Sequence, residues 1–216
     1  MRLLSCLFLI SVSAIHAEEI LFKDDFKKGL ADGWSWVRED PKAWRTTEEG
    51  LEMRILPGNL WGKANNAKNV LVRPVPDFGE DPIAITVGFD NTPTEQFEQI
   101  NLSWYYDDKN MVKFGLEKVH DNLCVVMGRE ENDKTKTVKI VKEATTKVDL
   151  RLVVHGNNIE GFFRLDGEKN WAKAGECALP AAENPKISIH AYNGPAKVER
   201  WAKVSGLTVK TFKAEE

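Results

Sequence analysis

Several motifs that mark common enzyme classes are missing from this sequence of 216 residues. It has no glycine-rich phosphate-binding loop, no Cys-x-x-Cys pair and no His-Glu-x-x-His zinc motif. It also lacks the Gly-x-Ser-x-Gly turn of the α/β-hydrolases. The net charge is −3, which gives little electrostatic support for binding nucleic acid, so we expect no nucleic-acid partner.

Long apolar runs are absent as well. Residues 3–12 are mostly apolar, but this run is shorter than the roughly 20 residues that span a bilayer. Arg2 precedes the run and Ala17 ends it with a small residue, which is the pattern of a secretory signal peptide. We therefore predict a signal peptide over residues 1–17 and a single mature domain over residues 18–216. That domain would be secreted or periplasmic and would not span a membrane.

Alternation of apolar and polar residues runs through most of the remaining chain, and no window has a long helical stripe. The alternating segments are residues 99–106, 112–117, 123–127, 150–154, 159–165 and 187–191. Turn-forming residues separate them at 107–110, 120–122, 156–158 and 166–167. Many short strands at regular spacing predict an all-β sandwich or barrel.

The alternation also predicts how three consecutive strands pair. Apolar residues must oppose one another across an antiparallel pair, which places Tyr106 opposite Val112. A two-residue turn at His120 then places Leu116 opposite Val125. One face of this sheet should be apolar, and the other should be open and polar, carrying Gln99, Asn101, Ser103, Tyr105, Lys113 and Glu117.

Two cysteines follow the predicted signal peptide. Cys124 falls on the polar face opposite Glu117, whereas Cys177 lies near the end of a different strand. An exported protein could pair them. Because nothing in the strand pattern brings them together, we predict two free thiols.

Aromatic residues supply the positive signal, since the chain has 7 tryptophans. Trp104 falls in phase with the core positions, and Trp34, Trp36 and Trp44 are also interpreted as packing residues. Trp61 differs, because it lies in the loop Pro57-Gly58-Asn59-Leu60-Trp61-Gly62. An aromatic ring beside amides and charges suits the recognition of a sugar. The candidate ligand-binding residues are Trp61, Gln99, Asn101, Tyr105, Lys113, Glu117, His190 and Tyr192.

Carboxylates could instead indicate an enzyme, because glycosidases use a pair of them. Glu95, Glu98 and Glu117 are the visible candidates, but Glu98 falls in phase with the core and Glu117 with the polar face. No convincing pair results, so we assign no catalytic residue. A glycoside hydrolase or polysaccharide lyase that uses Glu117 with Lys113, Tyr105 or His190 remains an alternative, as does a protein-interaction or adhesion module.

Acidic pairs at residues 24–25, 107–108 and 130–131 could ligate calcium through oxygen. None has the spacing of a calcium loop, and solvated acids at turns explain them more simply. Asp24 and Asp25 are weak candidates for a structural calcium, and we expect no other cofactor.

Three stretches resemble the beta-xylosidase C-terminal concanavalin A-like domains. They are Trp34-Ser35-Trp36 with Ala43-Trp44-Arg45, Asn59-Leu60-Trp61-Gly62, and Phe97-Glu98-Gln99-Ile100-Asn101-Leu102 followed by the stretch from Tyr106 to Glu117. The resemblance covers roughly residues 21–209. It implies a two-sheet antiparallel jelly roll of the concanavalin A-like lectin/glucanase type, without agreed catalytic residues. We therefore predict a non-catalytic module that binds a glycan or polysaccharide on its polar face, without a hydrolase domain of its own.

Overall fold

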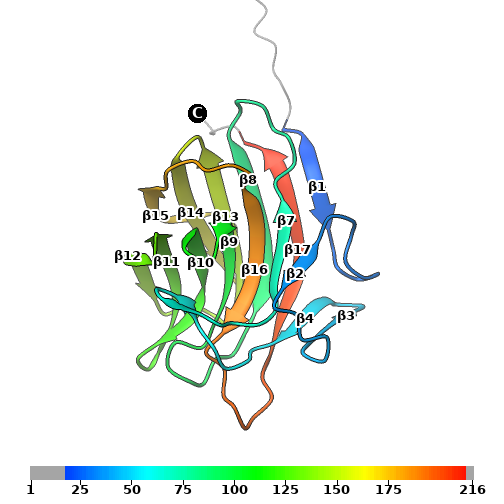
Figure 1. Ribbon diagram of the computed structural model, residues 1–216, viewed down its shortest axis with the longest axis vertical. Helices are drawn as coiled ribbons and strands as arrows, with labels where there is room; N and C mark the ends of the chain where they lie inside the picture. The colour runs from blue at the N-terminus through cyan, green and yellow to red at the C-terminus, as the bar shows by residue number, and fades with distance from the viewer. Residues whose placement is uncertain (1–17, 213–216) are drawn as a thin grey trace, which may run out of the picture.

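The computed structural model describes residues 18–212. This part of the chain is all-β, with two large antiparallel sheets and one small hairpin (Figure 1). The two sheets face each other across a hydrophobic core, which confirms the predicted sandwich. The predicted signal peptide, residues 1–17, lies outside the described residues. Residues 18–212 contain no helix that could cross a membrane.

The eight-stranded sheet has the order β15 (Ala172–Ala178), β14 (Asn158–Leu165), β13 (Lys147–His155), β8 (Ile83–Asp90), β17 (Trp201–Thr211), β4 (Gly50–Arg54) and β3 (Trp44–Thr47), and β1 (Ile20–Asp24) also pairs with β17. The seven-stranded sheet has the order β12 (Lys134–Lys142), β11 (Asn122–Glu131), β10 (Asn110–Val119), β9 (Gln99–Asp107), β16 (Lys186–Tyr192), β7 (Val70–Pro74) and β2 (Ser35–Val37). The hairpin of β5 (Leu60–Trp61) and β6 (Ala64–Asn65) lies between β4 and β7 in the chain.

The core follows directly from the alternation in the sequence. Ile100, Leu102 and Phe114 point inward from the seven-stranded sheet, and Leu150 and Leu152 point inward from the eight-stranded sheet. All five are fully buried in one cluster. Full burial of such a side chain contributes about 1.5–3 kcal/mol, so these positions hold the two sheets together.

The predicted strand register is correct for one pair and shifted for the other. β10 and β11 pair with Leu116 opposite Val125, as predicted. β9 and β10 pair with Trp104 opposite Val112, whereas the sequence predicted Tyr106 there. The consequence is that Glu117 lies opposite Gln99 rather than Asn101, and Lys113 lies opposite Ser103 rather than Tyr105.

A bulge explains the shift. Asp107 pairs with Asn110 across a two-residue turn, and the register then changes between Asn110 and Met111. The turn alone would place apolar residues opposite polar ones, and the bulge corrects this by one residue. The total shift is two residues, which is the side-chain period of a strand, so every residue stays on its predicted face.

The remaining aromatic residues and the thiols agree with the sequence analysis. Trp104 is buried in the core, and Trp34, Trp36 and Trp44 pack against it. Cys124 and Cys177 are both free, and Cys124 lies opposite Glu117.

Candidate functional site

The outer face of the seven-stranded sheet is covered, and the prediction of an open face is wrong. Residues 56–69, cyan to teal in Figure 1, form the cover between β4 and β7. Leu60 and Ala67 pack against Tyr105, Met111 and Tyr192 in a second hydrophobic cluster. As a result, the seven candidates on the strands are buried, namely Gln99, Asn101, Tyr105, Lys113, Glu117, His190 and Tyr192.

The β5–β6 hairpin is anchored to the sheet at two neighbouring points of β11. The Gly62 N–H donates to Glu130 Oε2 at 3.0 Å. The Trp61 ring lies against Gly128, where a Cβ atom would come within 2.6 Å of Trp61 Cη2. Burial raises the pKa of Glu130 to about 7, although the bond from Gly62 opposes the rise and the negative charge of Asp133 adds to it. Gly128 therefore makes room for the ring, and Glu130 holds its loop.

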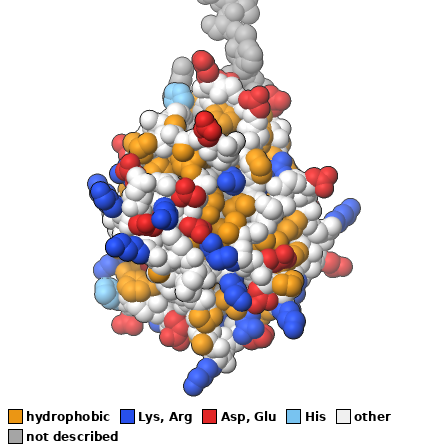
Figure 2. All heavy atoms as spheres, in the orientation of Figure 1, with side chains coloured by type: hydrophobic (Ala, Val, Ile, Leu, Met, Phe, Trp, Pro, Cys, Tyr) orange, Lys and Arg blue, Asp and Glu red, His pale blue; other side chains and the backbone are white. Residues whose placement is uncertain are grey.

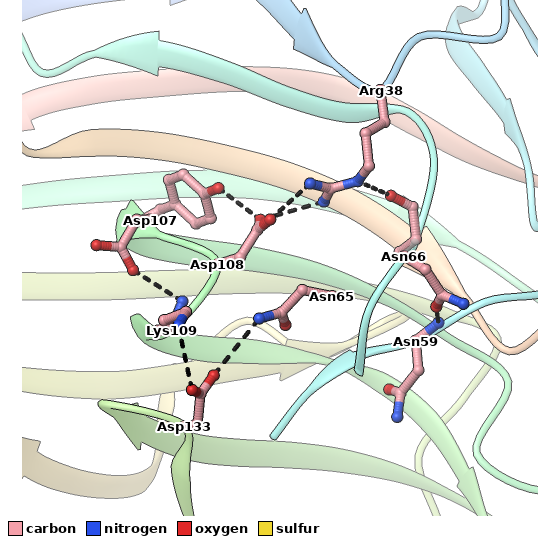
Figure 3. Close-up of polar contacts among 10 residues, drawn as sticks. Arg38, Asn59, Asn65, Asn66, Asp107, Asp108, Lys109 and Asp133 are labelled. Atoms are coloured by element: carbon pink, nitrogen blue, oxygen red, sulfur yellow. Dashed lines mark hydrogen bonds and ion pairs between the residues drawn. The ribbon is translucent and has the colours of Figure 1, made fainter. Parts of the chain in front are cut away.

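A second anchor, at the other end of the cover, is an ion pair (Figure 3). Arg38 donates through two nitrogens to the Asp108 carboxylate, at 2.5 and 3.1 Å, and its Nε donates to the Ala67 carbonyl at 2.6 Å. The Tyr105 hydroxyl donates to Asp108 Oδ1 at 2.7 Å. Burial alone would raise the pKa of Asp108, but the bonds from Arg38 and Tyr105 outweigh it and lower the pKa. Burial, together with Asp108, raises the pKa of Tyr105. Tyr105 thus holds the Asp108 carboxylate, through which Arg38 fixes the cover.

The neighbouring turns join the same network (Figure 3). Asp107 accepts a bond from the Lys109 N–H at 2.8 Å. Asp133 Oδ2 lies 3.4 Å from Lys109 Nζ, and its Oδ1 accepts a bond from Asn65 at 3.5 Å. These contacts tie the hairpin to the β9–β10 and β11–β12 turns.

Lys113 is at the centre of the covered face. Its Nζ donates to Gln99 Oε1 at 2.6 Å, Glu117 Oε2 at 3.1 Å and the Tyr192 hydroxyl at 3.3 Å. The same nitrogen lies 4.6 Å from the centre of the Trp61 ring, which is a cation–π contact. Burial lowers the pKa of Lys113, and the Glu117 carboxylate counteracts this. The Lys113–Glu117 pair, which the sequence suggested would be exposed, is a buried ion pair.

His190 and Asn101 support this centre from the side. His190 Nδ1 lies 3.1 Å from Ser188 Oγ, and its ring stacks on Tyr192. Burial and the charge of Lys113 lower the pKa of His190 to about 3, so the imidazole is neutral at pH 7. Asn101 Nδ2 donates to Gln99 Oε1 at 3.2 Å. Both side chains are therefore positioned to orient the residues around Lys113.

A pocket of about 320 Å³ opens beside Trp61. Gln99, Lys113 and Glu117 line it from the sheet, and Trp61 lines it from the hairpin. The complete lining is Asn59, Trp61, Phe97, Gln99, Lys113, Glu117, Val119, Val126, Gly128, Thr137, Ile140 and Asn193. Four of the eight predicted residues thus meet at one pocket, whereas Asn101, Tyr105, His190 and Tyr192 lie outside its lining.

Sequence reasoning missed the rim of this pocket. Phe97 and Ile140 are two of the four large hydrophobic side chains exposed in the described residues. Phe97 lies in the loop before β9, and Ile140 lies on β12, whose register with β11 shifts between Met127 and Gly128. That irregularity interrupts the alternation of apolar and polar residues that identifies the other strands. A lone Phe beside polar loop residues was the available signal.

The acidic candidates have roles within the chain. Glu98 Oε2 accepts bonds from the Thr94 and Glu95 amides at 2.7 and 3.0 Å, so it closes the loop before β9. Asp24 accepts bonds from the Phe26 and Ala31 amides and from the Trp34 indole, at 2.8, 2.9 and 3.0 Å.

Asp25 accepts a bond from the Lys27 amide at 3.0 Å. Within residues 18–212, no group of three or more His, Cys, Asp or Glu side chains is placed to hold a metal ion. A structural calcium at Asp24 and Asp25 therefore stays a prediction.

A larger hollow of about 650 Å³ lies on the eight-stranded sheet. Its lining includes Asp90, Lys147, Asp149, Arg164 and Lys203. Among the described residues that line it there is no predicted ligand-binding residue and no tryptophan. Charged side chains at a solvated surface occur without any bound ligand. The larger volume of this hollow therefore does not make it a better candidate for a binding site than the pocket beside Trp61.

Comparisons with known proteins agree with this architecture. BlXynB, a GH43 protein from Bacillus licheniformis, is similar with a TM-score of 0.76 and 20% identity, over 88% of this chain and 39% of that protein. The xylan beta-1,4-xylosidase from Bacillus halodurans C-125 has a TM-score of 0.74 and 15% identity, over 87% of this chain and 38% of that protein. This chain therefore spans well under half of either protein.

A third similar structure is comparable in size to this chain. The CBM2 module of the evolved Dit of Lactobacillus casei BL23 phage J-1 has a TM-score of 0.59 and 7% identity, over 92% of this chain and 98% of that module. At these identities the three structures establish the fold alone. No curated protein matches the chain in sequence.

The family assignment comes from the sequence itself. The model of the beta xylosidase C-terminal concanavalin A-like domain matches residues 23–182, which is most of the chain. The match includes β2 through β15 in full, and with them Trp61, Gln99, Lys113 and Glu117. The chain therefore belongs to the beta xylosidase C-terminal concanavalin A-like domain family.

Proposed function

We propose that this chain is a non-catalytic carbohydrate-binding module and that the pocket beside Trp61 holds the sugar. The observation that carries the proposal is the meeting of an indole ring with Gln99, Lys113 and Glu117 around one pocket of about 320 Å³. Small-molecule sites have volumes of about 300–1,000 Å³ and combine apolar walls with a few placed polar groups. A sugar ring needs the same combination, because it has apolar C–H faces and hydroxyl edges.

The number of carboxyl groups that line the pocket favours a binding role over catalysis. Glycosidases of either stereochemistry generally use two carboxyl groups that flank the bond to be cleaved. Glu117 is the one carboxylate among the described residues that line this pocket, and it is paired with Lys113. A hydrolase or lyase active at this site would need a further acid or base from elsewhere.

The test is a calorimetric titration of the full chain with soluble xylan and with neutral gluco- and xylo-oligosaccharides. We expect binding, and we expect Trp61→Ala to weaken it at least tenfold while Trp61→Phe keeps most of it. Trp171→Ala is the matched control, because Trp171 is a half-exposed indole that stacks with Arg151 and Arg164 on the eight-stranded sheet.

Two results would contradict the proposal. Failure to bind any member of a glycan array, with normal thermal melts, would favour a protein-interaction or adhesion module. Release of reducing ends or unsaturated sugars, abolished by Glu117→Gln, would favour an enzyme. Secretion stays a separate prediction, which the N-terminal residue of the protein from native cells would test.

A further inference from the structure

The charges that line the Trp61 pocket cancel each other. Lys113 and Glu117 are the charged residues among its lining, and their side chains form an ion pair at 3.1 Å. Both are buried, so solvent screens this pair much less than it screens a surface pair. A ligand in the pocket therefore meets no net charge from the lining.

Lys113 has no hydrogen-bond donor left for a ligand. An ammonium group has three N–H donors, and Lys113 Nζ contacts three acceptors, Gln99 Oε1, Glu117 Oε2 and the Tyr192 hydroxyl. A carboxylate or sulfate that entered the pocket would have to displace one of these bonds. It would also lie near Glu117, whose negative charge would repel it.

The polar atoms left for a ligand include acceptors. Asn59 Oδ1 is buried and has no hydrogen-bond partner among the described residues. Lys113 contacts Glu117 through Oε2, which leaves the second carboxylate oxygen for a ligand. Asn193 uses its Nδ2 to contact the Phe97 carbonyl at 3.4 Å, which leaves its carbonyl oxygen. Acceptors of this kind suit a ligand that donates through hydroxyl groups.

The rim adds apolar surface that the chain holds in place. Phe97 is 46% exposed and Ile140 is 40% exposed. Phe97 has a φ angle of +64°, a backbone conformation that is unfavourable for a bulky side chain. Its N–H donates to the Lys118 carbonyl at 2.8 Å, and its carbonyl accepts a bond from Gln99 Nε2 at 2.8 Å. Strain of this kind persists only where the surroundings enforce it, so the exposed ring is a maintained feature.

From this geometry we infer that the pocket is selective for uncharged sugar units and discriminates against uronates and sulfated sugars. The inference rests on the proposed carbohydrate-binding function and deepens it. The paired charges and the occupied Lys113 donors remove the attraction for an anion. The free acceptors and the apolar rim favour a neutral ring with several hydroxyl groups.

The test compares two oligosaccharides of equal length, a neutral xylohexaose and an anionic hexagalacturonate, by calorimetry at pH 7 and low salt. We expect the full chain to bind the neutral oligomer at least tenfold more tightly. Phe97→Ala should weaken binding of the neutral oligomer several-fold.

A charge-adding variant probes the selectivity itself. Thr137 lines the pocket and is exposed on edge strand β12, so Thr137→Lys should be tolerated. It should reduce the preference for the neutral oligomer at least fivefold by attracting the anionic one. Thr208→Lys on the outer face of the eight-stranded sheet adds the same charge away from the pocket and should leave the preference unchanged.

The outcomes separate this inference from the proposed function. Equal or tighter binding of the anionic oligomer would overturn the selectivity and leave a carbohydrate-binding module. A preference unaffected by Thr137→Lys, or neutral binding unaffected by Phe97→Ala, would show that the sugar binds elsewhere and would also overturn the inference. If neither oligomer binds and no glycan on the array binds, the proposed function and the inference are both overturned.

Discussion

Each sheet carries an ion pair on its outer face, and the two pairs differ in their surroundings. Lys113–Glu117 on the seven-stranded sheet has side chains that are 4% and 8% exposed, whereas the side chains of Arg164–Asp149 on the eight-stranded sheet are 34% and 37% exposed. Both pairs come from strands with the same alternation of apolar and polar residues. The difference arises because residues 56–69 cover one face. The same strand pattern therefore gives a buried ion pair under residues 56–69 and a solvated ion pair on the uncovered face.

The face seen in Figure 2 carries a mixture of charged and hydrophobic side chains. Charged side chains of both signs are interspersed on it, and hydrophobic side chains gather near its middle. Such mixed charge is the ordinary state of a soluble surface.

The largest effect we expect comes from breaking the covered ion pair. Lys113→Ala would leave Glu117 as a buried, unpaired charge, and changes of that kind cost about 3–5 kcal/mol of unfolding free energy. Arg164→Ala breaks the exposed pair and should cost about 0–1 kcal/mol. Urea denaturation of both variants measures the two losses. Equal losses would mean that the cover does not exclude water from Lys113.

Filling the space under Trp61 should have the next largest effect. Gly128→Ala would place a Cβ atom 2.6 Å from Trp61 Cη2 and 3.2 Å from Lys113 Cε. Overpacking of this kind costs about 1–3 kcal/mol. Gly175→Ala on β15 is the control, because its nearest contact, Lys139 Cβ at 3.3 Å, is less severe. Denaturation midpoints should fall for the first variant and change little for the second.

Glu130 should make the stability of the covered face depend on pH. Its folded-state pKa is raised by burial to about 7, against an ordinary value of 4.5. The folded state therefore binds the proton of the Glu130 carboxyl more tightly than the unfolded state does. The contribution of this proton to the unfolding free energy is complete below about pH 4.5 and is lost as the pH rises to about 7. We expect a loss on the order of 1–3 kcal/mol.

Glu130→Gln isolates this contribution. The variant keeps an acceptor for the Gly62 amide but does not titrate, so the wild type should lose more unfolding free energy than the variant between pH 4.5 and 7. Parallel pH profiles for the two proteins would contradict the role assigned to Glu130.

The smallest effect concerns the thiols, which belong to different sheets. Burial raises the pKa of Cys177 to about 11 and also raises the pKa of Cys124. Both should react slowly with a thiol reagent in the native state at pH 7 and quickly after unfolding without reductant. A mass-spectrometric count of labelled cysteines measures this. Detection of a peptide linking Cys124 to Cys177 would show that they are paired.

Much of this architecture follows from local sequence pattern. The side-chain period of a strand assigned Gln99, Lys113 and Glu117 to one face and Trp104 to the other, and both assignments agree with the structure. A two-residue error in the β9–β10 register did not affect them, because two residues is that period. Trp61 was singled out because a large aromatic residue on a polar loop has to pack on something.

Local sequence pattern is enough to predict the all-β class, the faces of the strands and four of the twelve residues that line the pocket. Long-range packing buries the polar face and brings residues such as Phe97, Asn59 and Ile140 to the same pocket. The physical reason is the range of the interactions involved. Alternation acts between neighbouring residues, whereas the cover depends on contacts such as Gly62 with Glu130, which are 68 positions apart in the chain. Contacts of that length leave no periodic trace in the sequence, because they depend on how distant segments pack.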